Sequence, residues 1–280
     1  MLQKLIEESQ AHDQYKADFI AAAKNFHFDE QAQIIAPAEL GLSSAPLELT
    51  EHALRQVCAK LGPAVFGKGS AKGLPFDYIA AIPRDLRGES FNRHIAAGNG
   101  SRWMVRGYET AARAVLDGSY PGGCNEQGDF ENTQYLKIVQ SFLDEGAGKY
   151  PGLHLSRSNV TADDLNTRVL WQDVPREDGG YVLGVAIVNG ETGQRKLKVL
   201  PLIQRTKCDN SIMISNEQSG IEFIHRGSFQ AMRVQFKAAI GKMLEAAGDL
   251  LNRMIEAESE AIPDFDAVLA GITLKYNWPQ

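Results

Sequence analysis

Residues 181–204 read YVLGVAIVNGETGQRKLKVLPLIQ, and this stretch decides the fold class. It contains two apolar runs, at 181–188 and 196–204, which flank a polar segment that begins with Asn189-Gly190. An Asn-Gly pair between two such runs is a strong sign of a β-hairpin. The sequence therefore predicts two antiparallel strands joined by a tight turn.

The segments that precede this hairpin add further strands. Short apolar runs at 153–160 and 167–171 are predicted as strands of the same sheet. Earlier in the chain, alternating residues over 101–116 predict a second hairpin, with Arg102 and Arg106 on one face. An antiparallel sheet is the expected result.

Helical periodicity appears at both ends of the chain and between the hairpins. An amphipathic helix is expected over 1–25, and a second begins at the capping residue Thr50 and ends at Gly62-Pro63. Further helices are expected at 76–82, at 84–97, from Asn132 onward and over 228–260. In the last of these, apolar residues recur every seven positions, as in a helix that packs on a sheet or on a partner chain.

These elements predict an α+β fold. It has an antiparallel sheet with a β-hairpin, a long C-terminal helix packed on the sheet, and a helical N-terminal region. We expect an N-terminal helical arm and connector at 1–48, a main α+β domain at 49–262 and a C-terminal tail at 263–280.

Composition and cysteine usage argue against several classes of protein. The hydrophobic fraction of 44% and the charged fraction of 23% are typical of a chain that buries a core. Three widely separated cysteines argue against a disulfide framework and against a zinc site. No run of about 18 apolar residues predicts a membrane span, and early acidic residues argue against a secretory signal. We therefore expect a cytoplasmic protein that contacts no membrane.

A partial phosphate-binding motif lies at residues 62–69. It matches G-x-x-x-x-G-K, but Gly69 replaces the Ser or Thr that would hold magnesium, and a helix precedes it where a strand is needed. No Ser, Cys or His carries the local signature of a nucleophilic site. The sequence therefore predicts a protein with no cofactor, no metal site and no catalytic activity.

The net charge of −6 is unevenly distributed along the chain. Residues 195–242 contain nine Lys or Arg and three acidic residues, whereas residues 1–54 contain three Lys and nine acidic residues. Residues 245–266 are again acidic. A basic stretch between acidic ends indicates a polyanionic ligand, because phosphate contacts supply most nucleic-acid affinity. The alternative is an ordinary solvated surface with local ion pairs.

Candidate nucleic-acid contacts are basic residues on the first hairpin, on the last strand and at the start of the long helix. They are Arg102, Arg106, Arg113, Lys196, Lys198, Arg205, Lys207, His225, Arg226 and Arg233. Aromatic rings stack on bases in single-strand binders, and Tyr108 and Tyr120 are candidates for this contact. Trp103 has the same chemistry but is expected in the core.

Four segments together are similar to one known family. They are Leu74–Arg87 with Phe91-Asn92, Ala112–Asp117 with Tyr120, Gly184–Gly193, and Arg205–Asn210 followed by His225-Arg226-Gly227. This pattern resembles the phage/plasmid-like domain-of-unknown-function family nine-three-two over residues 50–245. Asp117, Gly190 and Asn210-Ser211 depart from the family pattern. The resemblance implies a phage or plasmid context but no particular activity.

The order of elements is also similar to that of phage single-strand annealing proteins. In those proteins a hairpin, a helix, an antiparallel sheet and a long helix assemble into rings or filaments around a basic groove. This is a likeness of architecture, with no shared motif. It favours a single-stranded DNA-binding protein that acts as a homo-oligomer, with strand annealing as a candidate activity.

Two other functions stay open from the sequence. An interaction protein of the phage or plasmid could bind a host protein through the acidic residues 1–48. A metal-dependent nuclease could assemble its site only on folding. Binding of labelled oligonucleotide and cleavage in the presence of magnesium distinguish the three.

Overall fold

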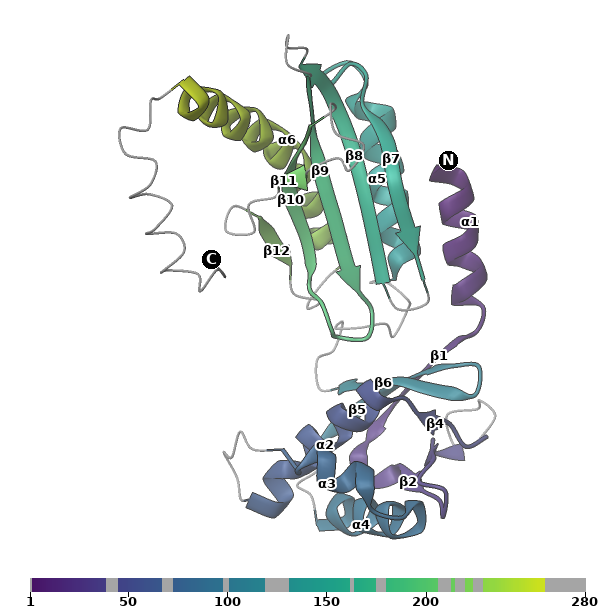
Figure 1. Ribbon diagram of the computed structural model, residues 1–280. Helices are drawn as coiled ribbons and strands as arrows, with labels where there is room; N and C mark the ends of the chain where they lie inside the picture. Colours follow the sequence, from purple (N-terminus) through teal and green to yellow (C-terminus); the bar gives the residue numbers. More distant parts are fainter. Residues whose placement is uncertain are drawn as a thin grey trace, which may run out of the picture.

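A computed structural model describes residues 2–38, 45–66, 73–97, 101–118, 131–161, 164–174, 180–205, 213–214, 220–223 and 229–259. The predicted fold class is confirmed: the protein is α+β, with antiparallel sheets and a long C-terminal helix packed on the larger sheet. The elements form two lobes, each built around its own sheet (Figure 1).

The larger lobe contains the four strands that the sequence predicted in this region and two short ones that it did not. The predicted strands are β7 (His154–Val160), β8 (Asp164–Val174), β9 (Tyr181–Gly190) and β10 (Leu197–Arg205), and the additional ones are β11 (Met213–Ile214) and β12 (Ile221–Phe223). The spatial order is β11-β10-β9-β8-β7, with β12 also paired to β10, and all pairs are antiparallel. The hairpin predicted from Asn189-Gly190 is confirmed as the β9–β10 connection.

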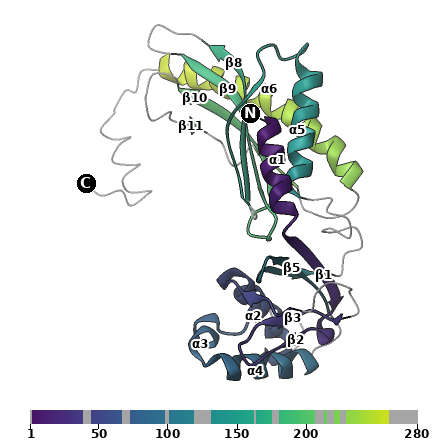
Figure 2. The ribbon, with the colours of Figure 1, turned by 90° about the vertical axis from the view of Figure 1, so that its right-hand side faces the viewer.

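Three helices belong to the larger lobe. They are α1 (Leu2–Asp13), α5 (Asn132–Gly146) and α6 (Phe229–Ser259). In Figures 1 and 2, α5 and α6 lie behind one face of the sheet, and α1 runs alongside α5 at the β7 edge. The predicted helices at 132 and 228–260 are therefore confirmed.

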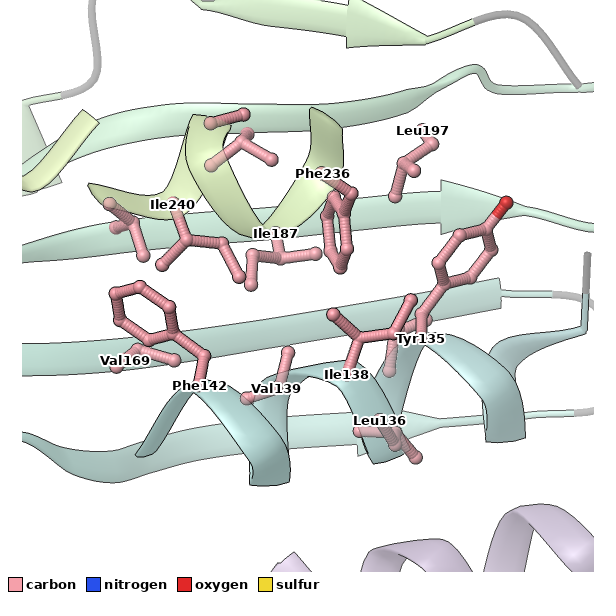
Figure 3. Packing of buried hydrophobic residues seen from close by; sticks show 14 of the residues in the cluster. Tyr135, Leu136, Ile138, Val139, Phe142, Val169, Ile187, Leu197, Phe236 and Ile240 are labelled. Carbon is pink, nitrogen blue, oxygen red and sulfur yellow. The ribbon is translucent and has the colours of Figure 1, made fainter. Parts of the chain in front are cut away.

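The core of the larger lobe lies between the sheet and these helices. Figure 3 shows Phe142 of α5, Ile187 of β9 and Phe236 of α6 pointing into the same layer. The Tyr135 ring meets the Phe236 ring edge-on, with 5.5 Å between centroids. Because residues alternate along a strand, apolar positions such as Leu197 and Val199 face this core, and Lys198 between them faces the opposite side.

In the smaller lobe α2 (Glu51–Phe66) packs on a four-stranded sheet, and α3 (Phe76–Ala81) and α4 (Arg84–Ala97) pack against α2. The strands of this sheet, in the order β1-β5-β6-β4, are β1 (Lys16–Ala22), β5 (Arg102–Tyr108), β6 (Ala111–Asp117) and β4 (Glu48–Leu49). The two-residue strands β2 (His27–Phe28) and β3 (Ile34–Ile35) pair with each other, and η1 (Ala23–Asn25) is a short 3₁₀ turn. The hairpin predicted over 101–116 is confirmed as β5–β6.

The N-terminal prediction needs a correction. A helix was expected over 1–25, but α1 ends at Asp13 and residues 16–22 form β1, which pairs along the whole of β5. The free edge of β5 supplies backbone hydrogen bonds that the sequence alone does not reveal, and Phe19 becomes buried in this arrangement. Residues 1–48, expected as an arm, therefore contribute to the cores of both lobes. The expected tail at 263–280 lies outside the described residues.

The predicted end of α2 also needs a correction. Thr50 caps the helix as expected, since its Oγ1 accepts a hydrogen bond from the Ala53 backbone N–H at 3.2 Å. Gly62-Pro63 does not end it, because α2 continues to Phe66. An interior proline loses one backbone hydrogen bond and crowds the carbonyl four residues earlier, which weakens a helix without preventing the following residues from adopting helical angles.

Candidate nucleic-acid interface

Arg106, predicted as an exposed contact on the first hairpin, is instead buried between the lobes. Its guanidinium donates to both carboxylate oxygens of Asp18, at 2.8 and 2.7 Å, and to Glu191 Oε2 at 3.1 Å. The side chain is 4% exposed. An arginine that is enclosed and doubly paired in this way cannot contact a phosphate, so Arg106 is withdrawn from the interface.

Arg106 belongs to a group of charges that we call the joint cluster, made of Lys16, Asp18, Arg106 and Glu191. Glu191, in the turn after β9, inserts its carboxylate between Lys16 Nζ at 2.7 Å and the Arg106 guanidinium. It also accepts the Asn132 backbone N–H at 2.6 Å. Burial acts to lower the pKa of Lys16, but the charges and hydrogen bonds of Glu191 and Asp13 outweigh it and raise that pKa. The joint cluster therefore ties the β9–β10 turn of the larger lobe to β1 and β5 of the smaller one.

Glu131, next to the joint cluster, gives the protein a pH-dependent stability. Burial, together with the negative charge of Asp13, raises the pKa of its carboxyl from 4.5 to about 7. Between these two values the folded protein holds a proton that the unfolded chain releases, so this carboxyl makes stability fall as the pH rises from 4.5 to about 7.

Glu131→Gln should remove this contribution. We expect the melting temperature of the variant to exceed that of the wild type at pH 8 and the difference to shrink towards pH 5, as measured by circular dichroism. A constant difference across that range would show that Glu131 does not titrate as described.

The other predicted residues of the smaller lobe lie on β5 and β6. Arg102 is exposed at the start of β5. The Arg113 guanidinium lies 5.2 Å from the centre of the Tyr108 ring, whose hydroxyl lies 3.1 Å from His12 Nδ1. Trp103 is 2% exposed and belongs to the core, as expected.

The predicted cationic face of the last strand is partly neutralised. Lys196 and Lys198 both pair with Glu222 of β12, at 2.7 and 2.6 Å. Hydrogen bonds from the two lysines lower the pKa of Glu222 to about 2, so this carboxylate stays charged. One net positive charge is left at this point of the sheet.

The remaining predicted residues fall into three groups. Arg205 ends β10, and only its backbone is described. Lys207, His225, Arg226 and Tyr120 lie outside the described residues. Arg233 is exposed on α6, on the helix-covered side of the sheet. The described members of the predicted set therefore do not meet on one surface.

A different basic surface lies between α5 and α6, and we call it the α5–α6 groove. Its cavity measures about 730 Å³ and includes one predicted residue, Arg233. The other lining residues are Phe142, Glu145, Gly146, Lys149, Tyr150, Gln230, Val234, Lys237, Ala238, Gly241, Lys242 and Glu245. Four cationic side chains and two carboxylates therefore surround an apolar floor.

Ion pairs hold two of the four cations in place across the groove. Lys237 pairs with Glu145, and Lys149 Nζ lies 3.0 Å from Glu245 Oε1. Hydrogen bonding from Lys237 lowers the pKa of Glu145, and the positive charge of Arg233 acts in the same direction. Arg233 and Lys242 form no ion pair with another described residue. Their two charges are the positive excess of the groove.

The floor of the groove is aromatic and firmly packed. The Phe142 and Tyr150 ring centroids are 5.8 Å apart, and the Trp171 ring meets Tyr150 edge-on at 5.2 Å. Gly241 lets α6 approach this floor closely, because a Cβ at this position would lie 3.2 Å from the Tyr150 hydroxyl. Both rings are largely buried, at 7% and 4% exposed, so they support the floor of the groove from beneath.

Only a weak signal for this groove is present in the sequence. Arg233 and Lys237 are four residues apart on α6, which makes them neighbours on the helix surface, but Lys242 is five residues further on and points in a different direction. Lys149 lies in a glycine-rich turn more than 80 residues earlier, and no local pattern links it to α6. Only the contact between α5 and α6 brings the four cations together.

Metal binding and nucleophilic chemistry find no support among the described residues. They contain no group of three or more His, Cys, Asp or Glu arranged to hold a metal ion. Burial raises the pKa of the Cys58 thiol to about 11, which keeps it protonated and unreactive.

Comparisons with protein-family models, with curated proteins and with solved structures find no match. The resemblance to the phage/plasmid-like family therefore stays a prediction from the four sequence segments. Among the helices in the described ranges, none combines the length and the apolar composition needed to cross a bilayer.

Proposed function

We propose that the protein binds single-stranded DNA in the α5–α6 groove. The observation that carries this proposal is the arrangement of Lys149, Arg233, Lys237 and Lys242 around a floor of two aromatic rings. Proteins that bind single strands combine a cationic groove, which follows the phosphates, with rings on which bases stack. The groove contains both parts.

The cations and the apolar residues of the groove have different roles in this proposal. Arg233 and Lys242 lie about two and a half turns apart on α6, and their charges are not taken up by described carboxylates, so they are available to phosphates. Phe142 and Tyr150 are only 7% and 4% exposed, so a base of a bound strand would meet only their outer edges. Val234, which is 69% exposed, extends the apolar surface at the rim.

A salt titration tests the groove directly. Binding of fluorescent oligo(dT) is followed by anisotropy from low to moderate salt, for the wild type and for Arg233→Ala/Lys242→Ala. Each lost phosphate contact reduces the slope of log K against log salt by about 0.7 for single strands, so the double variant should show a slope smaller by about 1.4. Its affinity at low salt should also fall.

Lys24→Ala is the matched control, because Lys24 is exposed on the smaller lobe, far from α6 in the chain. Its slope should equal that of the wild type. Equal slopes for all three proteins, or no binding even at low salt, would contradict the proposal. Parallel incubation with Mg²⁺ and analysis of the oligonucleotide length would reveal a nuclease, and mixing complementary strands would reveal annealing.

A further inference from the structure

A second cavity lies on the opposite side of the larger sheet, between α1 and strands β7 and β8. It measures about 820 Å³, which is within the range of small-molecule sites. Its walls come from Lys4, Leu5 and Glu8 of α1 and from polar residues of the two strands. Leu165 and Val169 of β8 face the core, so Asn166 and Arg168, which alternate with them, face this cavity.

The β7–β8 ladder is irregular at this cavity. The register of the pairing shifts between Leu155 and Ser158. Both odd-numbered and even-numbered residues of β7 line the cavity as a result. Bulges of this kind are common beside binding sites, where they redirect side chains.

Two chemical features of the cavity define its ligand. Asn159 and Asn166 are direct cross-strand partners, and their exposed amides present donors and acceptors side by side. Lys4 and Arg168 supply positive charge, and Glu8 holds Lys4 at the mouth through a 3.6 Å ion pair. Asparagine amides pair well with the edge of adenine, and Lys and Arg bind phosphate.

We propose that this cavity binds a mononucleotide, with the phosphate towards Lys4 and Arg168 and the base edge on Asn159 and Asn166. The site is separate from the α5–α6 groove, because it lies on the face of the sheet that α5 and α6 do not cover. Its occupancy therefore does not depend on single-stranded DNA binding, and the two proposals can fail independently.

Isothermal titration of the full chain with dAMP, deoxyribose 5-phosphate and inorganic phosphate tests this site. dAMP should bind, and deoxyribose 5-phosphate should bind about tenfold more weakly because it lacks the base. Asn166→Ala should weaken dAMP binding by about tenfold. Lys4→Ala should also weaken it, and this change is safe for folding because the Lys4 side chain is 79% exposed.

The groove variant Arg233→Ala/Lys242→Ala is the control, and its affinity for dAMP should equal that of the wild type. Four results would overturn the proposal: no binding of dAMP at millimolar concentration, equal binding of all three phosphates, unchanged affinity in Lys4→Ala and Asn166→Ala, or loss of binding in the groove variant. Loss of oligo(dT) binding without loss of dAMP binding would concern only the α5–α6 groove.

Discussion

Glu191→Ala should lower the free energy of unfolding by about 3 kcal/mol, because the change removes the buried carboxylate that Lys16 and Arg106 share and leaves each cation with one partner, Asp13 or Asp18. In the folded protein the Glu191 side chain is fully buried and faces Lys16 and Arg106. Its removal also deprives the Asn132 backbone N–H, at the start of α5, of its acceptor. Urea unfolding followed by circular dichroism measures the loss.

The matched control for Glu191 is Glu222→Ala on β12. Glu222 also pairs with two cations, Lys196 and Lys198, but it does so at the surface, where water replaces the lost partner. The control should leave the unfolding midpoint nearly unchanged. If both variants unfold at the same urea concentration, the joint cluster does not stabilise the contact between the lobes.

Phe236→Ala should cost about 3–5 kcal/mol, since it leaves a cavity at the centre of the larger core. Phe236 is fully buried and meets the rings of Tyr135 and Phe223 edge-on, at 5.5 and 6.0 Å between centroids. These contacts join α6 to α5 and to β12, so the surrounding side chains come from three elements. Side chains held by several different elements cannot move far enough to fill the cavity that the substitution leaves.

Val234→Ala is the control for Phe236, two residues away on the same helix and 69% exposed. Its change in stability should stay within about 0.5 kcal/mol in urea unfolding. A loss for Phe236→Ala that is no larger than that of Val234→Ala would mean that α6 does not pack on the sheet as described.

The elements with strong local patterns could be predicted from the sequence. The β9–β10 hairpin follows from Asn189-Gly190, and α6 follows from apolar residues spaced seven apart, because these signals need no partner from elsewhere in the chain. By contrast, β1 forms only because β5 offers a free edge, and the broken apolar stripe of residues 1–25 was interpreted as one helix. Strand pairing between distant segments leaves little trace in either segment.

Arg106 shows why a residue predicted to be exposed can be buried in the structure. Its alternation with apolar residues in β5 indicated an exposed arginine face, but Asp18 and Glu191, from two distant segments, enclose it. An alternating pattern shows which side chains of a strand point away from the apolar core. It does not distinguish water from a buried carboxylate partner.

The α5–α6 groove is a surface whose basic character, but not its position, could be predicted from the sequence. The basic character of residues 195–242 was visible in the sequence, and Arg233 was among the candidates, but its neighbours were not. Lys149 reaches the groove because α6 crosses α5 at Gly241, and that crossing is a property of the folded core. Charge asymmetry along the chain therefore indicates a class of ligand but does not locate the surface that would bind it.

Photo-crosslinking with an oligo(dT) strand that carries iododeoxyuridine, followed by peptide mass spectrometry, tests the location of bound DNA most directly. We predict adducts on Phe142 or Tyr150, or on the segment of α6 from Gln230 to Glu245, and their loss in Arg233→Ala/Lys242→Ala. Adducts confined to the β5–β6 hairpin or to the opposite face of the larger sheet would contradict the α5–α6 groove as the binding surface.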